Sequence, residues 1–585
     1  MKYKLETAKP FGSKKPLSAG VSLFLPYIQQ QRGKIILALV TMTTSSVASL
    51  LAPVIISRAV DTYVRLKDMD GLIRSAAVLM AIYLVGIWAS YTQIRTMGGV
   101  GRRVLFNLRA SLFAKLQELP LAFFTENKAG DLISRVNNDT DKLNQFVAQS
   151  LMQFMSTIFV MTGAAILAVS LNWRMGLVAL APAAAVLLIT KATAAWVKAK
   201  NVKSLQSLGG LSSEVQESLQ NFRVIVAFHR MDYFQRKFED ANARNYTAST
   251  SAGFANNIFM PMYGLAHHIA QLLVIAYGIT LIASGQLTAG LLIGFLLYVN
   301  NFYGPMRQLA TVWSSFQLAI AALERIVEVL ALTSDMPLAQ STPKTGDAVL
   351  EFRNVTFQYP GGKDVLRGVN LVLEQGKAYA LVGPTGGGKT TTASLMARLY
   401  DPTSGTISWR GESLQSIPPA ERARKIGVIT QEPFLFSGTV HENIVYGNPE
   451  YANSSPEQLS AALEQANLSA LMSRFPEGLS TKVATTGTSI SLGQKQLIAF
   501  MRAVLRKPEL LILDEATANI DTVTEQLLEE ILAKLPKETT RVIIAHRLNT
   551  IDNVDQIFFV NSGTVTPAGS MEHAVNMLLH EKRSS

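Results

Sequence analysis

An all-α half of membrane-spanning helices followed by an α/β domain is the fold class that three features of the sequence predict. Apolar runs of the roughly 20 residues needed to cross a bilayer recur in the first half of the chain. A glycine-rich loop lies between a strand-like and a helix-like segment in the second half, at residues 383–388. Charged residues make up only 16% of the 585 residues, which is unusual for a soluble protein.

The apolar runs predict six membrane helices, because the buried helices of a soluble core rarely sustain such runs six times over. The first four runs are Ile35–Ser57, Ala76–Ile94, Phe146–Leu171 and Met175–Val197, with a tight turn at 172–174. The last two share residues 245–306, which contain no Asp, Glu, Lys or Arg, and the expected turn between them is 283–288.

Charge placement predicts how these helices are oriented. Lys and Arg crowd the long connections after the second and fourth runs and are fewer in the alternate connections. Since these residues accumulate on the cytoplasmic side, we expect a plasma or inner membrane protein whose termini and α/β domain are cytoplasmic. The same pattern accounts for the net charge of +12 without nucleic acid as a partner. The absence of cysteine excludes disulfides, thiol catalysis and cysteine-ligated zinc.

The loop that leads from Leu381 to Thr391 is typical of a phosphate-binding loop. Its glycines have no side chains to keep backbone N–H groups away from phosphates, and the helix expected to begin at Thr392 presents its positive end. Lys389 supplies a mobile cation, and the hydroxyl of Thr390 is a suitable Mg²⁺ ligand. The loop alone indicates only a nucleotide.

Later positions make this prediction more specific. The apolar strand Leu510–Asp514 is followed directly by Glu515, so two carboxylates stand at its end, one for the Mg²⁺ shell and one to polarise an attacking water. Other polar groups stand at the ends of strands or the start of a helix: Gln431, His546, and Ser491 to Gln494 before a helix expected over 495–505. A serine and a glycine at a helix N-terminus form a second phosphate site.

In this order, the motifs resemble those of the ABC ATPases, and the whole chain resembles a half-size ABC exporter of the type I fold. The resemblance implies ATP and Mg²⁺ as cofactors and two ATPase domains that sandwich two ATP molecules. The ATP-binding residues it implies are Tyr359, Gly383, Pro384, Thr385, Gly386, Gly387, Gly388, Lys389, Thr390 and Thr391. It assigns catalysis to Glu515, His546 and Gln431, and Mg²⁺ to Thr390, Gln431 and, through water, Asp514. Contacts to the opposing ATP fall on Ser491, Leu492, Gly493, Gln494 and Asp521.

The resemblance also divides the chain into parts. We expect a cytoplasmic tail and interfacial helix over 1–34, the membrane domain over 35–334, a linker over 335–347 and the ATPase domain over 348–585. Two cytoplasmic loops of the membrane domain are each expected to carry a short transverse helix that rests in a groove of an ATPase. The first follows Phe123 and Phe124, and the second is expected near 212–220.

The predicted function is ATP-driven export of an amphipathic small molecule, a lipid or a peptide by a dimer in the membrane. An importer with the same fold and a siderophore-like substrate is one alternative. An ATP-gated channel or a regulatory membrane subunit is another, but the intact Glu515 and His546 argue against an inactive regulator. Membrane lipids and a second half-transporter are the other expected partners, and nucleic acid is not.

One departure from the family pattern bears on the dimer. Leu492 stands where the commonest signature has a glycine, beside an intact Lys389 and Glu515. That combination resembles one member of a heterodimeric exporter whose partner carries the weakened Walker B strand. A homodimer whose signature has drifted is the alternative, and the interpretation slightly favours the heterodimer.

The sequence says little about the substrate site. His267 and His268 are the groups within the spans most suited to titrate near neutrality, yet structural histidines are common beside helix bends. Tyr263, Tyr298 and Phe302 are candidates for an aromatic cavity, but aromatic side chains also pack helices. For all five we expect packing roles.

Overall fold

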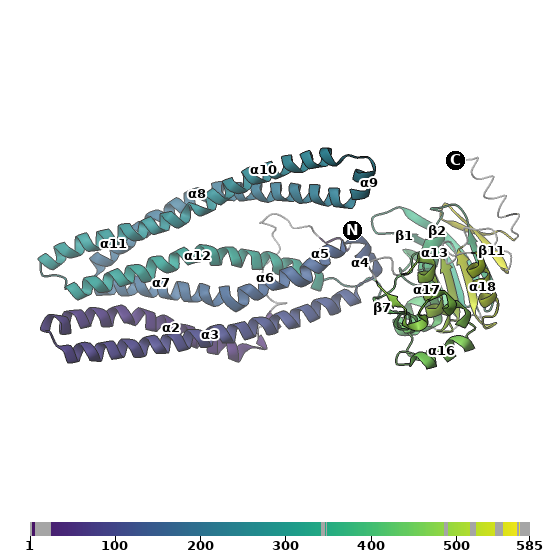
Figure 1. The fold of residues 1–585 in the computed structure, drawn as a ribbon, viewed down its shortest axis with the longest axis horizontal. Helices are drawn as coiled ribbons and strands as arrows, with labels where there is room; N and C mark the ends of the chain where they lie inside the picture. The colour runs from purple at the N-terminus through teal and green to yellow at the C-terminus, as the bar shows by residue number, and fades with distance from the viewer. Residues whose placement is uncertain are drawn as a thin grey trace. The chain divides into compact units, whose positions relative to one another are not determined.

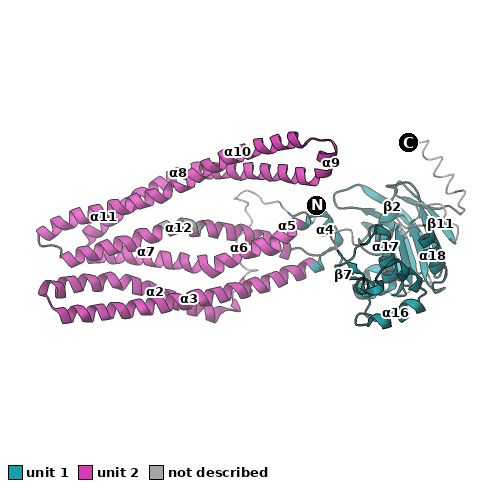
Figure 2. Ribbon diagram, viewed as in Figure 1, with its two compact units in different colours: residues 1–5, 117–129, 332–585 teal, residues 6–116, 130–331 magenta. Residues whose placement is uncertain are grey.

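The computed structural model describes residues 3–5, 25–27, 29–340, 346, 348–484, 490–514, 522–544, 554–569 and 573. These residues form two compact units (Figure 2). Unit 1 consists of residues 1–5, 117–129 and 332–585, and unit 2 consists of residues 6–116 and 130–331.

Unit 2 is a set of long helices (Figure 1). Its α-helices are α2 (Arg32–Ala59), α3 (Met69–Glu118), α5 (Ala129–Ser134), α6 (Thr140–Gln145), α7 (Leu151–Leu171), α8 (Trp173–Gln220), α9 (Phe222–Ala227), α10 (Met231–Asn257), α11 (Phe259–Ala283) and α12 (Ala289–Leu330). Three π-helical turns continue or join them, at Val60–Val64, Arg135–Asp139 and Phe146–Ser150. Helix α8 packs along α10 and α11, and α12 packs against α2, α7 and α11.

Five helical stretches among the described residues are long and apolar enough to cross a membrane: Arg32–Val64, Met69–Glu118, Ala129–Leu171, Trp173–Gln220 and Met231–Ala283. They contain the first five predicted runs. The sixth predicted run begins α12, which is helical throughout but does not belong to these five. The helical character of all six runs is therefore confirmed, and five of them meet the length and composition of a span.

Capping side chains fix two of the predicted turns. The Asn172 side chain accepts hydrogen bonds from the backbone N–H groups of Arg174 and Met175, so α8 begins directly after α7 ends. Thr288 caps α12 by accepting from the N–H of Leu291, and Asp61 accepts from the Thr288 hydroxyl and, at 2.8 Å, from the N–H of Gly290. The turns expected at 172–174 and 283–288 are confirmed.

The second short helix is not where we expected it. Residues 212–220 continue α8, and the separate short helix is α9, after a break at Asn221. Asn221 leaves helical geometry at φ −100° and ψ 16°, and its side chain donates to the Glu217 carbonyl at the end of α8. The prediction was wrong because the apolar spacing runs on through this break.

Aromatic hydroxyls anchor α12 within unit 2. Tyr298 donates to the carbonyl of Leu50 on α2 and Tyr303 donates to that of Ala179 on α8, each at 2.9 Å. Both rings are buried, and Tyr263 is nearly so beside Thr190. His267 lies edge-on to Tyr303, with ring centroids 5.8 Å apart. For Tyr263, Tyr298 and His267 these are packing contacts, whereas the packing roles expected for His268 and Phe302 stay predictions.

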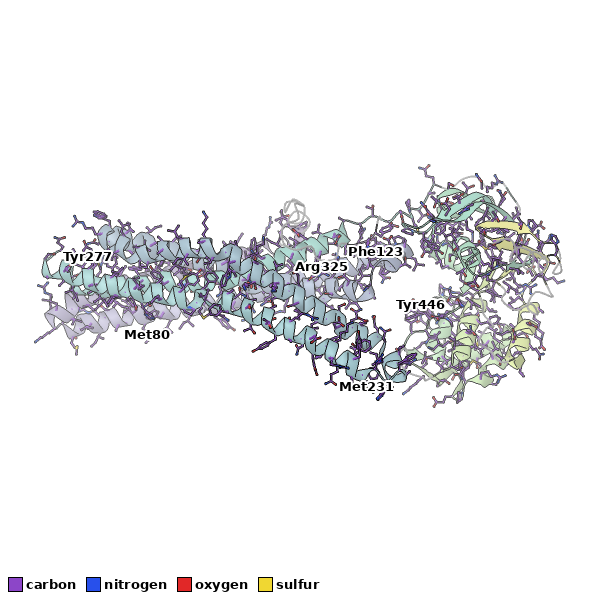
Figure 3. All side chains as sticks on the ribbon, turned by 90° about the horizontal axis from the view of Figure 1, so that it is seen from above. Met80, Phe123, Met231, Tyr277, Arg325 and Tyr446 are labelled. Atoms are coloured by element: carbon purple, nitrogen blue, oxygen red, sulfur yellow. The ribbon has the colours of Figure 1, made fainter. Side chains whose placement is uncertain are left out.

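A cluster of charges around the buried side chains of Arg135 and Asp139 joins α12 to the segment from α5 to α6. Arg135 is only 1% exposed and bonds to Glu328 at 2.7 Å and to Asp131 at 3.1 Å. Arg325, labelled in Figure 3, pairs with Asp131 at 2.7 Å and lies 3.2 Å from Asp139. Lys142 pairs with Asp139, so three cations balance three carboxylates. Buried charges of this kind need all of their partners.

The larger part of unit 1 is an α/β domain. A four-stranded sheet has the order β2-β1-β4-β5, and a six-stranded sheet has the order β12-β11-β3-β10-β9-β6. The strands are β1 (Leu350–Gln358), β2 (Asp364–Leu373), β3 (Ala378–Val382), β4 (Ser404–Trp409), β5 (Glu412–Ser413), β6 (Ile426–Ile429), β7 (Gly438–Thr439), β8 (Lys482–Val483), β9 (Leu510–Asp514), β10 (Thr540–Ile544), β11 (Gln556–Asn561) and β12 (Thr564–Pro567). Its α-helices are α13 (Lys389–Met396), α14 (Pro419–Lys425), α15 (Val440–Val445), α16 (Pro456–Gln465), α17 (Leu492–Val504) and α18 (Thr522–Ala533).

Unit 1 also includes α4 (Leu121–Glu126), which the chain inserts between two membrane helices, and the N-terminal residues 3–5. The Tyr3 hydroxyl accepts from the N–H of Asp335 at 2.7 Å, and its ring meets Phe123 edge to face. Asn127 donates to the Tyr3 carbonyl and accepts from the N–H of Leu5. Burial raises the pKa of Tyr3 well above its ordinary value, so this hydroxyl stays protonated. The N-terminal residues thus tie the linker to α4.

The charge cluster around Arg135 gives a stability prediction. Arg135→Met removes one cation and leaves Glu328 and Asp131 partly unpaired. Because these carboxylates are 19% and 37% exposed, we expect a cost below the about 3–5 kcal/mol of a fully buried pair. We expect the thermal unfolding midpoint of the purified protein in detergent to fall by about 5 °C or more. Arg236→Met, at an exposed arginine on α10, is the control and should change the midpoint little. An unchanged midpoint in the Arg135 variant would show that the cluster does not hold these helices together.

Candidate functional site

The glycine loop joins β3 to α13 and has the shape of a phosphate cradle. Gly383 adopts φ +149°, and a Cβ there would lie 2.0 Å from the carbonyl oxygen of Val560. Gly388, at φ +117°, is the N-cap of α13, and a Cβ there would lie 2.8 Å from Leu366. The loop therefore passes so close to its neighbours that only glycine fits, and its backbone N–H groups remain near the helix N-terminus.

Helix α13 begins at Lys389, three residues before the start that we expected. Lys389 and Thr390 therefore lie in its first turn, where the backbone N–H groups have no partner within the helix. The Lys389 side chain is 6% exposed and donates to the carbonyl oxygens of Gly383 and Pro384, at 2.8 and 3.0 Å. Its ammonium group is thus held inside the loop, where an anion would meet it.

The parallel strands of the six-stranded sheet bring the other predicted residues to the same edge. Strands β3, β10, β9 and β6 are parallel neighbours in that order. Ile544 on β10 pairs with both Leu381 and Asp514, so the ends of β3, β10 and β9 are level. Asp514 is buried at the end of β9, and Gln431 lies two residues past the end of β6. Parallel strands with level ends place their following loops side by side.

Three of the predicted site residues, Glu515, Asp521 and His546, lie outside the described residues. The strands that lead to two of them are described: β9 ends at Asp514, directly before Glu515, and β10 ends at Ile544, two residues before His546. The roles assigned to these side chains stay predictions.

The signature residues open α17, three residues earlier than expected. Ser491 is its N-cap and forms a reciprocal capping box with Gln494, since each side chain bonds to the other residue's backbone N–H. Gln494 also donates to the carbonyl of Arg474 at 2.7 Å. Leu492 is 41% exposed at the first helical position, beside Gly493. The helix N-terminus that we predicted is present and is ordered by its own side chains.

An aromatic cluster borders the glycine loop, and sequence reasoning found only one member of it. The Tyr359 hydroxyl bonds to that of Thr391 at 3.0 Å, and its ring meets Tyr400 edge to face with centroids 5.2 Å apart. Burial raises the pKa of Tyr400, and an interaction of its side chain with Thr125 on α4 lowers it. A chain of contacts therefore runs from the candidate nucleotide site to α4. An aromatic residue just after the loop's helix was the only sequence signal for Tyr400.

The residues described fit ATP and Mg²⁺. The loop is a cradle that a Cβ would fill, and the buried ammonium group of Lys389 lies within it. The hydroxyl of Thr390 lies in the first turn of α13, and the buried carboxylate of Asp514 lies at the end of β9. These are the groups that hold nucleotide phosphates and their metal in P-loop proteins. Fold and site together define a P-loop ATPase joined to a unit of membrane helices.

Comparison with known proteins agrees with that class. Residues 35–306 match the family described as ABC transporter transmembrane region, and residues 366–518 match the family described as ABC transporter. An uncharacterized ABC transporter ATP-binding protein, YfiC of Bacillus subtilis (strain 168), is 32% identical over 584 residues, covering 98% of this chain and 94% of the relative.

Two further relatives carry functional names. A fatty acid ABC transporter ATP-binding/permease protein of Mycobacterium bovis is 32% identical over 86% of this chain and 79% of its own length. A multidrug resistance ABC transporter ATP-binding and permease protein of Lactococcus lactis is 30% identical over 85% of this chain and 84% of its own length. The chain belongs to the ABC transporters, as an exporter-type half-transporter that couples ATP hydrolysis to transport.

Proposed function

We propose that this chain exports an amphipathic small molecule, such as a lipid or a hydrophobic drug, from the cytoplasm as one half of a dimer. The observation that carries the coupling is the contact chain from Tyr359 through Tyr400 to Thr125 on α4. It joins the rim of the candidate ATP site to a segment inserted between two membrane helices. The names of the fatty acid and multidrug relatives support an amphipathic substrate.

Each residue of the ATP site has a proposed task. The backbone of the loop and Lys389 bind phosphate oxygens, while Thr390, Gln431 and, through water, Asp514 hold Mg²⁺. ATP held there would supply the phosphoryl group that is cleaved, and Mg²⁺ would neutralise part of its charge. Glu515 orients the attacking water and accepts its proton, and His546 contacts the terminal phosphate.

Helix α9 supports the proposal of a dimer. Four large apolar side chains on or beside this short helix are strongly exposed: Phe222, Val224, Val226 and Phe228. An exposed apolar tip of this kind, at the end of two long helices, needs a partner surface. By the family resemblance, we propose that it rests on an ATPase domain of the second half-transporter.

The first prediction concerns turnover. Glu515→Gln keeps the shape of the side chain but removes the base, so we expect ATP hydrolysis to fall at least about 100-fold while ATP stays bound. Phosphate release and nucleotide retention in nanodiscs measure both effects. Uptake of a labelled fatty acid into inside-out vesicles should stop in the same variant, and Glu529→Gln, on the exposed face of α18, is the control.

An unchanged rate of hydrolysis in the Glu515 variant, with the partner's site inactivated, would contradict the assignment of this residue. ATP-dependent loss of the labelled molecule from such vesicles would instead indicate the importer. ATP-dependent flow down a gradient in both directions would indicate a channel.

The second prediction separates the two kinds of dimer. In a heterodimer, Lys389→Ala disables the fast site and abolishes steady-state hydrolysis, whereas Ser491→Ala affects only the slow site and leaves substantial activity. In a homodimer both changes affect both sites. The two variants should be compared in the chain expressed alone and together with a similar half-transporter.

Ser491→Ala also removes a helix cap, which by itself costs about 1 kcal/mol. Ser455→Ala is the matched control, because Ser455 forms the same capping box with Gln458 at α16, away from the signature. Brisk hydrolysis by the chain alone that Ser491→Ala abolishes and Ser455→Ala does not would refute the heterodimer.

The third prediction concerns sidedness. A cysteine placed at Gln286, in the turn before α12, should react with an impermeant maleimide added outside intact cells. A cysteine at Lys128, just after α4, should react only after the membrane is opened. Because the chain has no native cysteine, each label reports one position. The reverse pattern of labelling would invert the proposed orientation.

A further inference from the structure

A basic cavity lies between α2 and α3, the two helices drawn in purple and blue in Figure 1. Its volume is about 420 Å³, within the range of about 300–1,000 Å³ that small-molecule sites occupy. Among the residues that the structure describes, its lining contains three bases and no acid: Gln31, Lys34, Gly99, Arg102, Arg103 and Phe106. The cavity is separate from the ATP site and has no part in the mechanism proposed above.

The three bases are uncompensated. Within the part of the chain that the structure describes, neither Lys34 nor Arg102 has an ion-pair or hydrogen-bond partner. Among the described residues, the contact recorded for the Arg103 guanidinium is with the ring of Phe106, whose centroid lies 6.0 Å from the guanidinium carbon. Three positive charges that converge on one cavity, with no carboxylate among the described lining residues, favour an anion there.

Hydrogen bonds hold the walls of the cavity in place. The Tyr27 hydroxyl donates to the hydroxyl of Ser111 at 2.9 Å, and the amide of Asn107 donates to the side-chain oxygen of Gln30 at 3.3 Å. Both pairs join the segment before α2 to the far part of α3. At Gly99 an added Cβ would meet nothing within 4 Å, which leaves room on the α3 side. The three bases therefore stand on two elements that are tied together.

The position of the cavity indicates an amphipathic ligand. Lys34 immediately precedes the apolar run that begins at Ile35, and Arg102 follows the run that ends at Ile94. The spans that start beside the cavity expose large apolar side chains, among them Ile36 and Val40 on α2 and Ile94 on α3. An anionic group in the cavity would thus have a lipid-facing surface directly next to it, at the depth of the membrane boundary.

We propose that this cavity binds the phosphate headgroup of an anionic phospholipid. The lipid's acyl chains lie along the exposed apolar side chains of α2 and α3, and its phosphodiester accepts from Lys34, Arg102 and Arg103. Basic pockets between membrane helices bind anionic headgroups in this way. Under the proposed orientation the lipid belongs to the cytoplasmic leaflet. A free phosphate ion shares the headgroup chemistry but not the apolar contacts.

The test measures lipid preference in the full-length protein without ATP. The protein is placed in nanodiscs of phosphatidylcholine with a minority of phosphatidylglycerol, extracted mildly, and the retained lipids are counted by mass spectrometry. We expect wild-type protein to retain phosphatidylglycerol in clear excess over its share. In the variant Lys34→Gln/Arg102→Gln/Arg103→Gln, the ratio of retained phosphatidylglycerol to phosphatidylcholine should fall at least about tenfold. The reason is that each base near an anionic surface raises the affinity about fivefold.

A matched variant controls for loss of charge alone. Arg58→Gln/Arg65→Gln/Arg74→Gln removes three exposed bases from the opposite ends of the same two spans and should keep the preference. Equal retention in the cavity variant and the wild type would overturn the proposal. So would displacement of the lipid by millimolar inorganic phosphate, because the cavity would then be a site for a soluble anion. The readout needs neither hydrolysis nor transport, so its failure would leave the proposed function untouched.

Discussion

The parallel pairing of β3, β10, β9 and β6 is the constraint on which the catalytic half depends. Each strand is short and fully or largely buried, and the level register of Leu381, Ile544 and Asp514 brings their following loops to one edge. A shift of one residue in this register would turn each inward side chain toward the opposite face. It would also separate the glycine loop from the carboxylate at the end of β9. The chemistry of the site is thus a consequence of strand pairing between distant segments, among them β3 and β10, which start 162 residues apart (540 − 378).

The glycine loop adds a second constraint, because it must pass close to another strand. The carbonyl of Val560 on β11 fills the space where a side chain at Gly383 would stand. The loop is therefore packed against β11 in addition to being shaped by its own turn. Lys389 is then directed into the loop, where two carbonyl oxygens satisfy its ammonium group. The attraction between this preorganised cation and a phosphate becomes stronger as water is excluded, because charges interact more strongly in a low-dielectric site.

The helical half depends on a different balance. The lipid environment stabilises each apolar helix as a membrane span. Apolar contact alone, however, selects no unique arrangement of similar helices. The hydroxyls of Tyr298 and Tyr303 and the charge cluster around Arg135 provide directional contacts between particular helices. They place α12 against α2, α8 and the segment from α5 to α6, which makes α12 the common neighbour of several spans.

By itself, the sequence determined the class of protein, the apolar runs, the turns at 172–174 and 283–288 and the order of the site motifs. These features are local: a span needs about 20 apolar residues, and a phosphate loop needs its glycines within a few positions of its lysine. The sequence misplaced the second short helix and the first turns of α13 and α17, because a capping residue or a break moves a boundary without changing apolar spacing. Only the tertiary structure revealed the link from Tyr359 through Tyr400 to Thr125, and the convergence of Lys34, Arg102 and Arg103. Those groups lie far apart in the chain, and no local pattern encodes which distant segments the packing of helices and strands will bring together.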